Sequence, residues 1–295
     1  MSAKAVHPWS TWPAPAKLNL FLRIVGRRDD GYHLLQTVFR LLDWGDEVRL
    51  RVRDDGAIVR SAGDPGIAPD DDLVVRAARA LQRATGSPLG AEIALAKRIP
   101  VGAGLGGGSS DAATTLLALN ELWDTRWPRE RLAGLALALG ADVPLFVHGR
   151  SAWAEGVGER LTPLQLPPRW YVILDPRVHV ATAALFQAPE LTRNAAPATI
   201  PRFVSGTVTD NAFEPVARAR HAQVAAALDW LGRFGKARLS GSGGAVFLEC
   251  EGEAGARETA KHAPPHFTVI VAEGVNASPV EEALRRMRDN RQRTF

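Results

Sequence analysis

The chain has 295 residues, of which 46% are hydrophobic and 23% charged, proportions typical of folded globular proteins rather than of disordered or fibrous ones. Its 36 basic and 32 acidic residues give a net charge of +4, and they are scattered, which fits an anionic small molecule at least as well as nucleic acid. The single cysteine, Cys250, excludes an intrachain disulfide and a multi-cysteine metal site, and it indicates a reducing, cytoplasmic location. Because no apolar stretch has the length of a signal peptide or a membrane span, we expect neither secretion nor a membrane partner.

The first half of the chain predicts alternating strands and helices. Strands are predicted over 17–25, 48–53 and 91–99, and helices over 72–85 and 129–139. In the first strand the two-residue alternation places Lys17 and Asn19 on the same face. Gly86 and Gly140 are expected to end the two helices. A further helix is predicted to reach Asn120, with its start capped by Ser109, Ser110 or Asp111.

The second half of the chain predicts a separate α+β domain. The proline-rich stretch 162–168 is interpreted as the boundary between domains at 1–162 and 163–295. Beyond it, strands are predicted over 171–175, 236–240, 245–250 and 267–273, and helices over 216–234, 253–262 and 279–289. Residues 188–203 are typical of a surface loop. Residues 1–12, with Trp9 and Trp12, are expected to form either a disordered leader or a cover on the first domain.

The most informative stretch is "PVGAGLGGGSSDAATT", residues 100–115. A glycine loop between a strand and a helix is an anion site, because free backbone N–H groups and the positive end of the helix dipole converge there. No Lys-Ser or Lys-Thr pair closes the loop, so it is not a Walker motif. Gly102, Gly104 and Gly107 match a dinucleotide-binding pattern, but the acidic residue that this pattern needs at the end of a following strand is missing. The lysine and HRD-like motifs that accompany a protein-kinase glycine loop are also missing.

The same loop resembles the signature with which the GHMP small-molecule kinases wrap the phosphates of ATP. Three further stretches resemble that family in the expected order: "PAPAKLNLFLRIVGRRDDGYHLLQTVF", "LGADVPLFVHGRSAWAEGVGE" and "ARLSGSGGAVF". The resemblance implies an α+β fold of two domains, an N-terminal ribosomal-protein-like α/β sandwich and a C-terminal ferredoxin-like domain. It also implies ATP-dependent phosphorylation of an alcohol. The match is close to a member whose substrate is a cytidine diphosphate-linked sugar alcohol, phosphorylated on its 2-hydroxyl.

The resemblance implies roles for individual residues. Asp142 is expected to be the catalytic base, and the charge of Lys17 to steady that carboxylate and the attacking oxygen. The substrate is expected to contact Asn19, Tyr32, His33, Thr182 and Phe186, with its base between the rings of Tyr32 and Phe186. ATP is expected to contact Pro100, Val101, Gly102, Ala103, Gly104, Leu105, Gly106, Gly107, Gly108, Ser109 and Ser110. A glycine turn in residues 239–247 is expected to pack against this loop from the second domain.

Mg²⁺ is expected to arrive with ATP and to touch Ser109 or Ser110, although no carboxylate cluster assigns its protein ligands. Three alternatives stay open at this point. The first is a kinase of the same family that acts on another alcohol, which the aromatic residues suited to a nucleobase disfavour. The second is a nucleotide-dependent oxidoreductase. The third is a nucleic-acid-binding module, since the expected fold of the first domain is shared with a ribosomal protein, but the scattered charge favours no nucleic-acid partner. The oligomeric state is not predicted.

Overall fold

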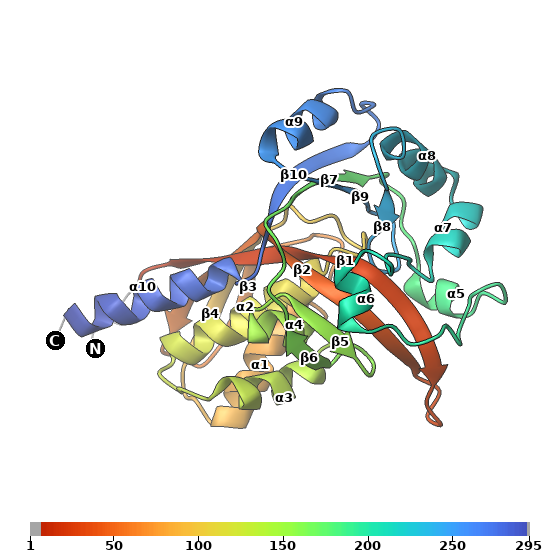
Figure 1. The fold of residues 1–295 in the computed structure, drawn as a ribbon. Helices are drawn as coiled ribbons and strands as arrows, with labels where there is room; N and C mark the ends of the chain where they lie inside the picture. Colours follow the sequence, from red (N-terminus) through yellow and green to blue (C-terminus); the bar gives the residue numbers. More distant parts are fainter. Residues whose placement is uncertain (1–6, 294–295) are drawn as a thin grey trace, which may run out of the picture.

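A computed structural model describes residues 7–293. At its centre lies a long antiparallel pair of strands, β1 (Ser10–Arg27) and β2 (His33–Arg53), which runs across the whole molecule in Figure 1. The register places Lys17 opposite Leu41. A tight turn joins the strands, with Gly31 at a φ of +90° that favours glycine. The predicted strands 17–25 and 48–53 are therefore segments of two much longer strands.

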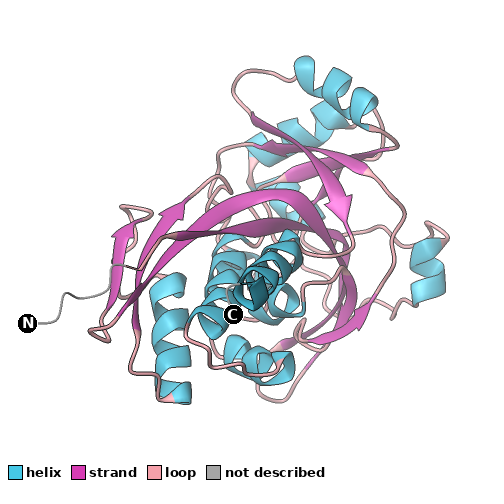
Figure 2. Ribbon diagram, turned by 90° about the vertical axis from the view of Figure 1, so that its left-hand side faces the viewer, coloured by secondary structure: helices cyan, strands magenta, loops and turns pink. Residues whose placement is uncertain are grey.

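The first half of the chain completes a sheet and covers one of its faces with helices (Figure 2). Further strands of this sheet are β3 (Ile58–Ala62), β4 (Gly90–Ala96), β5 (Ala152–Glu155) and β6 (Arg160–Pro163). The helices are α1 (Leu73–Thr85), α2 (Gly107–Leu122), α3 (Arg129–Leu137) and α4 (Val143–His148). As predicted, α1 ends at Gly86 in the left-handed conformation.

The second half of the chain forms an antiparallel layer in the order β10-β7-β9-β8. Its strands are β7 (Trp170–Asp175), β8 (Arg238–Leu239), β9 (Val246–Cys250) and β10 (Thr268–Val275). Its helices are α5 (Thr182–Phe186), α6 (Ile200–Val204), α7 (Glu214–Arg220), α8 (Ala222–Leu231), α9 (Glu253–Lys261) and α10 (Pro279–Arg293). Strand β10 joins the two layers, because its end pairs with Leu41 and Leu42 of β2. Among the described residues 7–293, no helix is long and apolar enough to cross a membrane.

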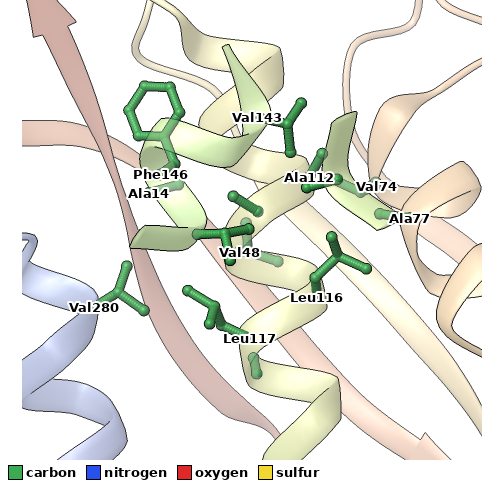
Figure 3. Close-up of a cluster of buried hydrophobic side chains, with 14 of the residues drawn as sticks. Ala14, Val48, Val74, Ala77, Ala112, Leu116, Leu117, Val143, Phe146 and Val280 are labelled. Carbon is green, nitrogen blue, oxygen red and sulfur yellow. The ribbon is translucent and has the colours of Figure 1, made fainter. Parts of the chain in front are cut away.

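The buried hydrophobic residues form one core in each half and a third between them. The last helix, α10, crosses back to the first half: Val280 and Leu284 belong to the same buried cluster as Leu117 of α2 and Phe146 of α4 (Figure 3). The core of the first half therefore also includes residues of α10. A domain boundary between residues 162 and 163 stays a prediction.

Two predicted helix ends and one helix predicted as continuous differ from the structure. Helix α2 begins at Gly107 with Gly106 as its N-cap, so Ser109, Ser110 and Asp111 lie inside the helix and do not cap it. Helix α3 ends at Leu137 with a right-handed Ala138 as its C-cap, so Gly140 is not its cap. The helix predicted over 216–234 is broken at His221, which is extended and lets two short helices each bury an apolar face.

The two tryptophans of the leader contact the first half of the chain. Trp12 lies within β1 and is 2% exposed. The ring of Trp9 lies 4.9 Å from the guanidinium carbon of Arg51, and Arg49 lies over the same ring. Trp12 is therefore part of the sheet, and Trp9 packs against side chains of β2. Residues 1–6 lie outside the described part of the chain.

Candidate active site

The glycine loop leads from β4 to the first turn of α2. Gly102, Gly104 and Gly106 have φ values of +72°, +76° and +76°, a left-handed conformation that side chains other than glycine rarely adopt. No side chain caps the helix that follows. The first N–H groups of α2 are therefore available to an anion such as a phosphate.

The protein itself also approaches this loop closely. A Cβ on Gly104 would lie 2.2 Å from the carbonyl oxygen of Ser240, and one on Gly106 would lie 3.0 Å from Cγ of Lys17. Ala245 N–H donates to the Ala103 carbonyl over 3.0 Å, and Ser240 Oγ to the Gly104 carbonyl over 3.0 Å. The predicted packing of the second glycine turn against the loop is thus confirmed, and both halves of the chain fix the shape of the loop.

Lys17 is buried at the foot of the loop with 3% of its surface exposed. Its ammonium donates to Asn19 Oδ1 over 2.5 Å and to the Gly104 carbonyl over 3.0 Å, and it lies 3.4 Å from Asp142 Oδ2. Asn19 is held in turn, because its amide donates to Thr37 Oγ1 over 2.9 Å. A buried ammonium with three oxygen partners has a fixed position. The contact between Lys17 and Asn19 confirms that the two side chains lie on the same face of the strand.

Asp142 approaches the Lys17 ammonium from the start of α4. It is the N-cap residue of α4, yet its carboxylate makes no capping hydrogen bond, and its side chain is 34% exposed. Pro144 in the first turn of α4 stiffens the backbone beside it. A carboxylate that is fixed on one side by an ammonium and open on the other can accept a proton from a hydroxyl.

Two cavities meet at the glycine loop. The larger, about 870 Å³, brings together seven residues predicted for catalysis or substrate binding: Lys17, Asn19, Tyr32, His33, Asp142, Thr182 and Phe186. The smaller, about 300 Å³, is lined by predicted ATP-binding residues, namely Pro100, Val101, Gly102, Ala103, Gly104, Leu105, Gly106, Gly107, Gly108 and Ser109. Gly102, Gly104, Gly106 and Ser109 line both. Ser110 lines neither and is fully buried.

The aromatic end of the larger cavity brings together Tyr32, His33 and Phe186. His33 stacks on Phe186 with 4.8 Å between ring centroids and 20° between planes, so it covers one face of Phe186. Tyr32 is 65% exposed. Burial, together with the charges of Arg193 and Arg27, lowers the pKa of His33, and its buried Nε2 has no hydrogen-bond partner in the described residues. A neutral ring with an unsatisfied nitrogen is suited to the edge of a base, while a base between Tyr32 and Phe186 stays a prediction.

Sequence reasoning missed a buried ionic cluster behind the loop. Lys97 bridges Asp46 and Asp111, with 2.8 Å to Asp111 Oδ2. Asp46 also accepts the N–H groups of Arg98 and Ile99, the residues that lead into the loop. Burial raises the pKa of Asp111 to about 7, against the opposing effect of Lys97. Asp111 therefore ties α2 to the strand side of the loop, a contact that cannot be read from its place among possible helix caps.

Two family models match the chain. The model of the GHMP kinases N terminal domain covers residues 72–150, and that of the GHMP kinases C terminal covers residues 204–264. A protein of Xanthomonas campestris pv. campestris is 59% identical over 277 residues, which are 94% of this chain and 94% of that protein. The chain belongs to the GHMP kinase family and is an ATP-dependent small-molecule kinase. The predicted two-domain α+β architecture of that family is confirmed.

Its relatives narrow the class. The Xanthomonas protein is named 4-diphosphocytidyl-2-C-methyl-D-erythritol kinase, and a protein of the same name from Halorhodospira halophila is 55% identical over 94% of this chain and 96% of its own. A crystal structure of 4-(cytidine 5'-diphospho)-2C-methyl-D-erythritol kinase is 36% identical with a TM-score of 0.77, covering 90% of this chain and 99% of that one. Homoserine kinase from Cytophaga hutchinsonii, 21% identical with a TM-score of 0.67 and covering 94% of this chain and 98% of its own, shares the fold.

Proposed function

We propose that this protein transfers the γ-phosphoryl group of ATP to the 2-hydroxyl of 4-diphosphocytidyl-2-C-methyl-D-erythritol, a step in making isoprenoid precursors by the non-mevalonate pathway. The observation that carries the proposal is the Lys17–Asp142 pair, 3.4 Å apart, in a cavity that also contains the glycine loop and an aromatic end suited to a nucleobase. The names of the close relatives supply the substrate.

In the proposed reaction, the 2-hydroxyl oxygen forms a bond to the γ-phosphorus while the bond from that phosphorus to the β-γ bridging oxygen breaks. The hydroxyl proton passes to the Asp142 carboxylate, and ADP leaves with the bridging oxygen. Lys17, held by Asn19 and the Gly104 carbonyl, stabilises negative charge on the attacking oxygen. The backbone N–H groups at the start of α2 hold the phosphates in line with that oxygen.

Mg²⁺ bound with ATP would neutralise charge on the phosphate oxygens. Ser109 fits a place beside it, because it lines both cavities in the first turn of α2. Ser110 does not fit, because it is fully buried and lines neither cavity. Within residues 7–293 no cluster of three or more His, Cys, Asp or Glu side chains could hold a metal ion, so the phosphates and water would supply most of its ligands.

Three further properties are part of the proposal. The domain boundary lies between residues 162 and 163. The protein works in the cytoplasm, a reducing compartment that suits a chain whose single cysteine is Cys250. It binds its two small-molecule substrates and no nucleic acid, since its charges are scattered.

The test of the proposed function is ADP release with ATP, Mg²⁺ and 4-diphosphocytidyl-2-C-methyl-D-erythritol, with mevalonate, homoserine and galactose as parallel acceptors. Turnover with the cytidyl substrate alone is expected. Turnover with another acceptor would keep the family and replace the substrate. ATP binding without turnover on any of the four would overturn the proposed substrate. Undiminished turnover after chelation of divalent ions would remove Mg²⁺ from the account.

A further inference from the structure

The charged side chains that line the larger cavity are not equally occupied. Among the described residues, they are Lys17, Arg27, Asp30 and Asp142. Lys17 and Asp142 pair with each other over 3.4 Å, and Asp30 pairs with Arg28 over 2.7 Å. No ion pair within residues 7–293 involves Arg27. Its guanidinium is thus a cation at the wall of the cavity whose charge no carboxylate of the described chain neutralises.

Arg27 is held beside the aromatic end of the cavity. It is the last residue of β1, directly opposite His33 in the strand register, where the hairpin passes α5 (Figure 1). Its Nε donates to the Gly31 carbonyl over 2.9 Å, which fixes the guanidinium against the turn that carries Tyr32. The two terminal nitrogens of the guanidinium take no part in this hydrogen bond. Burial is the main cause of the lowered pKa of His33, and the positive charges of Arg193 and Arg27 lower this pKa further.

The position of Arg27 matches a chemical need of the proposed substrate. A diphosphate links the cytidine to the sugar alcohol and carries negative charge between the base and the reacting hydroxyl. Lys17 stands at the reacting end, where it pairs with Asp142 and donates hydrogen bonds to Asn19 and the Gly104 carbonyl. Arg27 is a second cation in the wall of the same cavity, at its aromatic end. An arginine suits a diphosphate because a guanidinium can bond two phosphate oxygens at once.

We propose that Arg27 binds the diphosphate of the acceptor substrate and so selects acceptors that carry this group. The inference rests on the proposed function and deepens it. It makes Arg27 a substrate-binding residue, and the bond from its Nε to Gly31 makes its placement part of the same turn as Tyr32 and His33.

The first test is the Arg27→Gln variant of the whole protein. KM for the cytidyl substrate is expected to rise by about tenfold, because a charge-assisted hydrogen bond is lost, while kcat and KM for ATP stay close to the wild-type values. Arg83→Gln is the charge-matched control, since Arg83 is exposed, lines neither cavity and forms no ion pair within residues 7–293. An equal rise in KM for both variants would reduce the effect to general attraction and overturn the proposal.

A purely structural role for Arg27, as the anchor of the turn, is separated by two further measurements. Arg27→Lys keeps the charge without the guanidinium fork and is expected to recover part of the lost affinity, whereas loss of the anchor would leave it as weak as Arg27→Gln. Inhibition constants of CDP and cytidine are then compared. In Arg27→Gln, that of CDP is expected to rise while that of cytidine is unchanged.

An equal loss for both inhibitors would show that Arg27 only shapes the base site, and it would overturn the proposal. The outcomes also separate the inference from the proposed function. If the wild-type protein does not phosphorylate the cytidyl substrate, the proposed function fails. If it does, and Arg27→Gln leaves KM and the CDP inhibition constant unchanged, only the role of Arg27 fails.

Discussion

The two ends of the larger cavity are built in opposite ways. At the reacting end, Lys17 is 3% exposed, donates hydrogen bonds to two oxygens and pairs with the Asp142 carboxylate. Both halves of the chain hold the glycine loop beside it. At the aromatic end, Tyr32 is 65% exposed on a hairpin turn, and Phe186 lies in the five-residue helix α5. The first end is fixed by buried polar contacts, and the second rests on short, accessible elements.

This difference indicates a division of labour. Phosphoryl transfer requires groups that are already in place before the reaction, because the transition state tolerates little misplacement. Recognition of a base can use exposed rings that adjust when the substrate arrives. Changes at the reacting end should therefore lower turnover, and changes at the aromatic end should weaken binding of the acceptor.

The largest effect is expected from Asp142→Asn. Removing a general base costs about 10²- to 10⁴-fold in kcat, whereas the affinity for ATP, measured by calorimetry, should stay unchanged. Asp70→Asn is the control, because Asp70 is exposed and lines neither cavity. A kcat within the error of the wild-type value would remove Asp142 from the catalytic role.

Lys97→Met tests how far the ionic cluster behind the loop stabilises the fold. The change leaves Asp46 and Asp111 buried without their shared cation, and it should lower the free energy of unfolding by about 3 kcal/mol. This is the lower end of the cost of breaking a buried ion pair, because Asp111, whose pKa burial raises to about 7, can take up a proton. Urea unfolding at pH 7 measures it, and Arg53→Met, which breaks an exposed pair with Asp55, should leave the midpoint nearly unchanged. A Lys97→Met midpoint equal to that of the control would make the cluster energetically neutral.

Tyr32→Ala tests the aromatic end. Loss of stacking on one base costs about 1–3 kcal/mol, so KM for the cytidyl substrate should rise by about 5- to 150-fold, with kcat and KM for ATP preserved. Phe234→Ala provides the control, because Phe234 is an exposed ring that lines neither cavity. A lower kcat with unchanged KM would place Tyr32 in catalysis and break the division between the two ends.

The smallest effect is expected from Thr182→Val. Thr182 Oγ1 lies 2.6 Å from Ser242 Oγ, so the change removes one exposed hydrogen bond that ties α5 to the glycine turn. The acceptor KM should rise by about threefold, the cost of a typical neutral hydrogen bond. Steady-state kinetics with varied acceptor concentration measure this change, and a loss of kcat instead would extend the fixed region to α5.

The sequence predicted what depends on local pattern. Two-residue alternation put Lys17 beside Asn19, and the density of glycine identified the loop, because both follow from neighbouring residues. It could not predict contacts made only by the fold: Asn19 N–H meets Ser240 Oγ across 221 positions of the chain, and Lys97 meets Asp46 across 51. The break at His221 interrupts an apolar pattern that continues on both sides, so tertiary packing and not local preference decides it.

The most direct test of the division between the two ends is the double variant Asp142→Asn with Tyr32→Ala, measured by single-turnover phosphoryl transfer over a range of acceptor concentrations. If the ends act independently, Tyr32→Ala should raise the half-saturating acceptor concentration by the same factor in both backgrounds, within about twofold. A factor that shrinks or disappears in the Asp142→Asn background would contradict the account, because it would mean that base recognition and proton transfer act as one unit.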